Sequence, residues 1–148
     1  MITTIAPSQC PWELLLLADP SRDLVESYLS DAVTLASFDV DTIQGVVVMT
    51  PISSDSWEIK NIAVREDLHG RGIGKDLLKA ALLECQTRGA RHVWIGTGNS
   101  SIAQLGLYQR VGFRMAAIDR DFFVRNYPDK IIENGIECRD MVRLVCSF

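Results

Sequence analysis

The segment from Val64 to Leu78 constrains the fold of this chain more than any other. It has the pattern of an apolar strand end, a turn with three glycines in five residues, and the start of an amphipathic helix. Such a turn directs several unpaired backbone N–H groups to one point before the helix, where the helix dipole favours negative charge. Glycine lets a ligand approach the backbone closely because it has no Cβ. The segment therefore predicts a phosphate-binding loop between a strand and a helix.

Basic side chains accompany this turn at Arg65, Arg71 and Lys75, although the formal net charge of the chain is −4. In two common phosphate-binding loops, one position of the sequence pattern does not match this chain. The dinucleotide fingerprint needs a third glycine where Lys75 stands after Gly72, and the Walker loop needs Ser or Thr in place of Asp76. A glycine-rich turn that binds no ligand remains the alternative to a phosphate site of another kind.

The length and composition are those of one globular domain. The chain has 148 residues, of which 47% are hydrophobic and 23% charged, so we expect a single domain, residues 1–148, with a sizeable core. It has no apolar run of membrane-spanning length and no secretory signal pattern, which favours a cytoplasmic protein without a membrane partner.

The cysteines, histidines and charges narrow the functional classes. The four cysteines are widely spaced, which favours free thiols over disulfides or a metal site. His69 and His92 are the only histidines and have no partner at ligand spacing, so we expect no metal. The acidic balance and the lack of a long basic stripe argue against general nucleic-acid binding.

Hydrophobic periodicity predicts alternating strands and helices. Strands are expected at residues 2–5, 32–38, 43–50, 57–64, 92–96, 113–118 and 141–145, and helices at 11–18, 21–29, 73–88 and 102–111. Gly89 would end the long helix, and Asn134-Gly135 between apolar residues predicts a hairpin turn. This order fits an α/β sandwich around a largely antiparallel sheet.

The loop His69-Gly70-Arg71-Gly72-Ile73-Gly74 resembles the pyrophosphate loop of the GNAT superfamily of N-acetyltransferases, whose pattern is Gln/Arg-x-x-Gly-x-Gly/Ala. This chain departs from the pattern in the first position, where it has His69. A second region, Asn99 to Phe113, is similar to the family's short helix that ends in Tyr-x-x-x-Gly-Phe. The nine-residue spacing from Asn99 to Tyr108 is longer than in many family members. With the strand before the loop, the two regions cover residues 57 to 113 in the family's order.

The resemblance implies an α/β (α+β) fold with a mixed, mostly antiparallel central sheet of about six to seven strands and about four helices. It implies acetyl-CoA as the cosubstrate, without a metal. The loop residues implied to bind the coenzyme are His69, Gly70, Arg71, Gly72, Ile73, Gly74 and Lys75. Main-chain contacts to the pantetheine arm are implied for Ile62, Ala63 and Val64, and a further coenzyme contact for Asn99. Asn99 has an alternative interpretation as the cap of the helix that follows it.

Two side chains are implied to carry the chemistry. In the family, the tyrosine at the position of Tyr108 protonates the departing thiolate, and a phenol with a pKa of about 10 suits a thiolate with a pKa of about 8.5. Glu58 precedes His69 by eleven residues, the spacing at which some GNAT enzymes carry a general base. An alkylammonium must lose a proton before it attacks a thioester, and a carboxylate can accept that proton. The alternatives are a core tyrosine and an ion pair between Glu58 and Lys60.

The resemblance predicts transfer of an acetyl group from acetyl-CoA to a primary amine by direct attack. The acceptor is expected to be small and cationic, with an amine on a protein as a second option. Residues 119–128 and 133–137, which mix acidic and aromatic side chains, are expected to form the wall of its cleft. The alternatives are a non-catalytic acyl-CoA sensor and, less favoured, a phosphate-loop hydrolase. The chain is expected to be a monomer or a homodimer.

Overall fold

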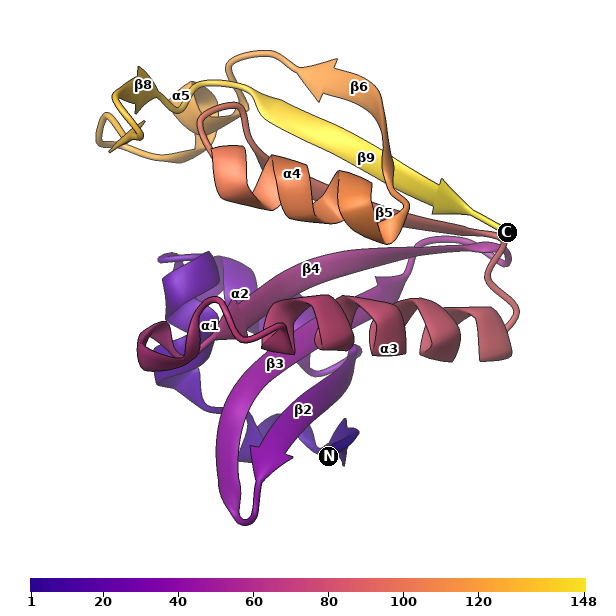
Figure 1. Ribbon diagram of the computed structural model, residues 1–148. Coiled ribbons are helices and arrows are strands. Elements are labelled where there is room, and N and C mark those ends of the chain that lie inside the picture. Colours follow the sequence, from indigo (N-terminus) through magenta and orange to yellow (C-terminus); the bar gives the residue numbers. More distant parts are fainter. The chain divides into compact units, whose positions relative to one another are not determined.

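The apolar runs between residues 33 and 64 form long antiparallel strands in the computed structural model, which describes all 148 residues. The chain divides into two units, residues 1–93 and residues 94–148. In the first unit β1 (Ile2–Ile5), β2 (Val33–Asp39), β3 (Thr42–Pro51) and β4 (Ser56–Val64) pair in this order, each with its neighbour antiparallel (Figure 1).

Three α-helices belong to this first unit. They are α1 (Trp12–Ala18), α2 (Arg22–Leu29) and α3 (Ile73–Thr87), with two short 3-10 turns, η1 (Pro7–Gln9) and η2 (Glu66–Leu68). The hydroxyl of Ser21 accepts a hydrogen bond from Leu24 N at 3.3 Å and so caps α2. The apolar stripe of α3 is buried, as its helical spacing predicts. The helix ends before Gly89, which has φ +95°.

Helices cover both faces of these four strands. Val46 and Val48 of β3 belong to a core cluster with Leu15 of α1 and Val25 of α2. The opposite face carries α3, which packs against β2, β3 and β4 (Figure 1). A Cβ at Gly45 would lie 2.9 Å from a methyl of Leu77, so the absence of a side chain there permits this close approach. Alternate residues of β3 therefore face different helices.

β4 carries a β-bulge at Lys60. Val48 pairs with Asn61 and Met49 pairs with Ile59, so Lys60 has no partner on β3. Directly paired residues share a face of the sheet. The bulge therefore shifts the alternation of β4, because Asn61 lies on the α1–α2 face and Ile59 on the α3 face.

The strand β5 (His92–Gly98) begins in the first unit and continues into the second from Trp94 onward. It is followed by α4 (Ile102–Val111), β6 (Arg114–Asp119), α5 (Phe122–Asn126), β7 (Ile132–Glu133), β8 (Ile136–Glu137) and β9 (Met141–Ser147). β9 lies between β5 and β6 and is antiparallel to β6. β7 and β8 form a separate hairpin. Its turn residues Asn134 and Gly135 have φ angles of 57° and 73°, as the Asn-Gly turn predicts.

The predicted strands, helices and hairpin are confirmed in kind and order, with ends that differ by a few residues. The sequence did not predict α5 or the two 3-10 turns, which are too short to show a helical period. The expectation of six to seven sheet strands agrees with the seven strands β1 to β6 and β9. None of the helices combines the length and the hydropathy of a membrane-spanning segment. The single-domain organisation stays a prediction.

Candidate active site

The junction between β4 and α3 has the loop geometry that the sequence predicts. Arg65 N donates to Gln44 O at 2.9 Å and extends the pairing of β4 with β3 to the start of the loop. Gly70 and Gly72 both have φ +82°, a left-handed conformation that glycine adopts without a steric cost. Gly72 is the N-cap of α3 and offers no side chain to the helix amides. The alternation of ordinary and left-handed residues turns successive N–H groups to one side.

The backbone amides of this loop have no acceptor in the protein. The first helical bond of α3 runs from Asp76 N to Gly72 O at 3.0 Å, which leaves the amides of residues 73–75 outside the helical ladder. No protein group accepts from the amides of residues 70–72 either. Arg71 and Lys75 are exposed and form no ion pair, whereas Arg65 is paired with Asp67 at 3.1 Å. The loop therefore offers a run of free N–H donors with two unpaired cations beside it.

His69 folds back onto the end of β4. Its Nε2 lies 2.9 Å from Val64 O, and because a carbonyl only accepts, Nε2 carries the proton. The amide of His69 donates to Glu66 O at 3.3 Å. Both groups are thus used within the loop, and Nδ1 is the remaining polar atom of the ring. The structure places His69 where it fixes the loop against the strand.

The main-chain groups of Ile62, Ala63 and Val64 do not all point the same way. Arg65, which directly follows β4, and Gln44 of β3 form a hydrogen-bonded pair of residues. Along two antiparallel strands, hydrogen-bonded pairs alternate with pairs whose N–H and C=O groups point away from the partner strand. Ala63 therefore directs its N–H and C=O toward Val46 of β3. Ile62 and Val64 direct theirs away from β3, where Val64 O meets His69.

The Glu58 side chain lies on the α1–α2 face of the sheet, because Glu58 pairs with Thr50 beyond the bulge. Its side chain is 16% exposed, and its carboxylate lies 3.0 Å from Lys60 Nζ. The ion pair considered from the sequence is therefore present. On the same face, Asn61 Nδ2 donates to Leu15 O at 3.0 Å and to the Tyr28 hydroxyl at 3.2 Å. These bonds hold β4 to α1 and α2 beside Glu58.

Tyr108 is buried in the second unit. It lies on α4, is 4% exposed, and has its ring centroid 6.2 Å from that of Phe113. Burial raises the pKa of its hydroxyl to about 12, because an ionised phenol loses hydration in such a site. The hydroxyl therefore holds its proton throughout the neutral and moderately alkaline range.

Asn99 connects the turn before α4 to the segment that precedes β9. Its Nδ2 donates to Glu137 O at 3.1 Å, and its Oδ1 accepts from Arg139 N at 2.9 Å and Asp140 N at 3.0 Å. One amide hydrogen is left for a further bond. Asn99 is not the cap of α4, whose N-cap is Ser101. The bonds of Asn99 fix the backbone of the predicted acceptor wall.

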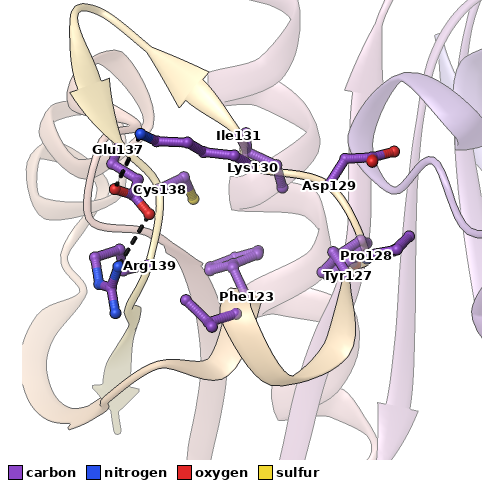
Figure 2. A pocket seen from close by; sticks show the side chains of 10 residues that line it. Phe123, Tyr127, Pro128, Asp129, Lys130, Ile131, Glu137, Cys138 and Arg139 are labelled. Atoms are coloured by element: carbon purple, nitrogen blue, oxygen red, sulfur yellow. Dashed lines mark hydrogen bonds and ion pairs between the residues drawn. The ribbon is translucent and has the colours of Figure 1, made fainter.

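The predicted wall folds around a pocket of about 230 Å³ (Figure 2). Its apolar part includes the rings of Phe123 and Tyr127, which stack with centroids 5.6 Å apart. Figure 2 shows Glu137 between Lys130 and Arg139, which lie 3.7 and 3.0 Å from its carboxylate. The acidic side chain is thus neutralised within the wall.

The sequence pattern predicts residues 119–128 and 133–137 for this wall and misses five lining residues. These are Asp129, Lys130, Ile131, Cys138 and Arg139. They flank the Asn-Gly hairpin, and the hairpin itself is the one signal that could have included them. A hairpin brings together the segments on both of its sides.

Comparisons with known proteins find a family model that matches most of the chain. Residues 6–113 match the model of the Acetyltransferase (GNAT) family. The chain is 50% identical over 133 residues to the uncharacterized N-acetyltransferase YvbK of Bacillus subtilis, covering 90% of this chain and 86% of that protein.

Solved structures cover the whole chain. A GNAT family acetyltransferase from Elizabethkingia anophelis, with acetyl-CoA bound, is 42% identical with a TM-score of 0.96 and covers 100% of this chain and 97% of its own. A Bacillus subtilis acetyltransferase in complex with CoA is 45% identical with a TM-score of 0.95, and the likeness covers 99% and 97% of the two chains. The predicted fold class is confirmed by these likenesses.

Proposed function

The chain belongs to the GNAT family of N-acetyltransferases, which use acetyl-CoA, and from this we propose that it acetylates a primary amine by direct attack on the thioester. Membership decides against a phosphate-loop hydrolase and favours an enzyme over an acyl-CoA sensor.

The free amides at the start of α3 are the observation that carries the proposal. A pyrophosphate presents several anionic oxygens, and the N–H groups of residues 70–75 have no protein acceptor to displace. Arg71 and Lys75 are unpaired and add positive charge at the same place. We assign the pyrophosphate contacts to these residues, including Gly70, Gly72, Ile73 and Gly74. His69 contributes by fixing the loop, and its own contact is limited to Nδ1.

The pantetheine arm is proposed to bond main-chain groups of β4. The groups of Ile62 and the N–H of Val64 point away from β3, so they suit this role better than those of Ala63. One such N–H is proposed to stabilise the oxyanion of the tetrahedral intermediate. Asn99 is proposed to donate its remaining amide hydrogen to the coenzyme. Its other amide hydrogen is donated to Glu137 O, which positions the acceptor wall.

Glu58 is proposed as the general base. The bulge at Lys60 places its carboxylate on the α1–α2 face, where Asn61 fixes the strand by two hydrogen bonds. Partial exposure lets an ammonium group or a bridging water reach the carboxylate, which lies 3.0 Å from Lys60 Nζ. A carboxylate so placed can accept the proton that the amine must lose.

Tyr108 is proposed to protonate the departing thiolate. Its pKa of about 12 makes it a weak acid in water, but burial raises the pKa of a thiol in the same way. In this protein, burial raises the pKa of Cys85 to about 12. A thiolate leaving into a dry site is therefore basic enough to take the proton of a buried phenol.

The acceptor is proposed to be a small primary amine with an apolar or aromatic part. An alkylamine of this kind is cationic at neutral pH. The pocket lined by Phe123 and Tyr127 suits the apolar part, since its ionic groups neutralise one another. A panel of such amines, with acetylated products identified by mass spectrometry, tests this assignment.

Glu58→Gln is expected to lower kcat/KM about 100-fold at pH 7, because the amide cannot accept the proton. The loss should shrink as the pH approaches the pKa of the amine, where free amine is already present. Lys60→Gln is the matched control, since it breaks the same ion pair and keeps the carboxylate. Initial rates of CoA release with a saturating amine compare the two variants.

The two substitutions separate the general base from a structural ion pair. A base role predicts a loss for Lys60→Gln of less than about tenfold. Equal losses in both variants, or a loss in Glu58→Gln that does not change with pH, would remove Glu58 from the mechanism.

A further inference from the structure

β6 is an edge strand that leaves an apolar surface uncovered. It has β9 on one side and no strand on the other (Figure 1). The residues from Arg114 to Ile118 are all exposed, and Met115 and Ile118 expose 55% and 64% of their surface. An edge with free backbone groups and exposed apolar side chains is a template for pairing with another strand.

A β-bulge at Ala116 puts the two large apolar side chains on one face. Met115 pairs with Leu144 and Ile118 pairs with Val142, while Ala116 has no partner on β9. Leu144 and Val142 share a face because they are two residues apart on β9. Met115 and Ile118 therefore share that face too, which an uninterrupted strand would not allow.

The charged ends of β6 lie on the opposite face. Arg114 pairs with Val145 and Asp119 pairs with Met141, and these two β9 residues are an even number of positions apart. β6 therefore carries an apolar pair on one face and one charge of each sign on the other. Arg114 forms no ion pair in its own chain, and Asp119 uses one oxygen, Oδ1, to bind Arg125 at 2.8 Å.

We propose that β6 pairs with β6 of a second copy of this chain, antiparallel and about a two-fold axis between Ala116 and Ala117. In this register Met115 lies opposite Ile118 of the other copy, on the apolar face. Arg114 lies opposite Asp119 of the other copy, on the charged face. Each contact occurs twice, as in an isologous interface.

The charge order selects a second copy in this register over other strands. When the two strands run antiparallel, each Arg114 lies opposite an Asp119 of the other copy, and each Met115 lies opposite an Ile118 on the same face. A parallel copy in register would put Arg114 opposite Arg114 and Asp119 opposite Asp119. The bulge is necessary for the match, because without it each apolar side chain would lie on a different face.

Ile118→Lys is expected to convert a dimer to a monomer, raising the dimer dissociation constant at least about 100-fold, because the change occurs twice in the interface. Sedimentation equilibrium of the full chain at micromolar concentrations measures this constant. Leu83→Lys is the matched control, since Leu83 is 65% exposed on α3 and should leave the dimer intact. Thermal unfolding of both variants, at equal midpoints, verifies their fold.

Charge exchange tests the register itself. Arg114→Asp and Asp119→Arg should each weaken the dimer at least about tenfold by opposing like charges, and the double variant should recover most of this loss. A monomeric wild type, a dimer broken by Leu83→Lys and not by Ile118→Lys, or a double variant weaker than either single one would overturn the proposal.

Discussion

Gly72→Asp is expected to raise the dissociation constant for CoA at least about 100-fold, because the loop is proposed to hold the pyrophosphate. Two effects add. Gly72 has φ +82°, a conformation that an aspartate adopts less readily, and the carboxylate would stand among amides that have no other acceptor. Its negative charge would repel the phosphates at close range. Calorimetric titration with CoA measures the effect.

Two control variants separate backbone strain from charge. Gly89→Asp places the same residue at φ +95° with open space around its Cβ, at the far end of α3. It should lower stability and leave CoA affinity within about twofold. Gly72→Ala keeps the strain without the charge and should fall between the two. Normal CoA affinity in Gly72→Asp would contradict the loop assignment.

Tyr108→Phe should lower kcat about 1,000-fold with CoA affinity changed by less than about twofold. The variant removes one oxygen from a buried ring and keeps its packing against Phe113. The expected loss exceeds that of Glu58→Gln, because water reaches the partly exposed side chain of Glu58 more easily than that of Tyr108, a residue that is 4% exposed. Single-turnover rates and CoA titrations report the two quantities. Unchanged turnover would remove Tyr108 from the mechanism.

The pH profile of the wild type adds a second readout for Tyr108. Since burial raises its pKa to about 12, its proton stays in place and kcat should show no alkaline limb from this group below pH 10. The raised pKa of Tyr108 also makes the free energy of unfolding depend on pH. The folded chain keeps this proton between pH 10 and 12 while the unfolded chain releases it, so the stability from this group is complete below pH 10 and falls as the pH rises. Tyr108→Phe should lose that part of the slope.

Local patterns predicted the scaffold of the site. The helix over 73–87 followed from five apolar side chains at helical spacing, and the loop before it followed from glycines that a left-handed turn requires. The Asn134-Gly135 hairpin followed from turn chemistry alone. These features depend on residues close in sequence, so the sequence displays them directly.

Features set by distant residues were not predictable from one sequence. The bulges at Lys60 and Ala116 depend on how β4 and β6 pair with other strands. Asn99 bonds residues about 40 positions away, and nothing near it in sequence indicates this role. The loop pattern predicts a ligand contact for His69, and its bond to Val64 O appears only when the loop folds back on the strand.

Selective ¹⁵N labelling of the ten glycines tests the central claim most directly, because each amide reports on its own position. The claim is that main-chain amides between β4 and α3 hold the pyrophosphate of the coenzyme. Addition of CoA should move the amide signals of Gly70, Gly72 and Gly74 and leave those of Gly89 and Gly135 in place. Saturable CoA binding with the three loop signals unmoved would contradict the claim.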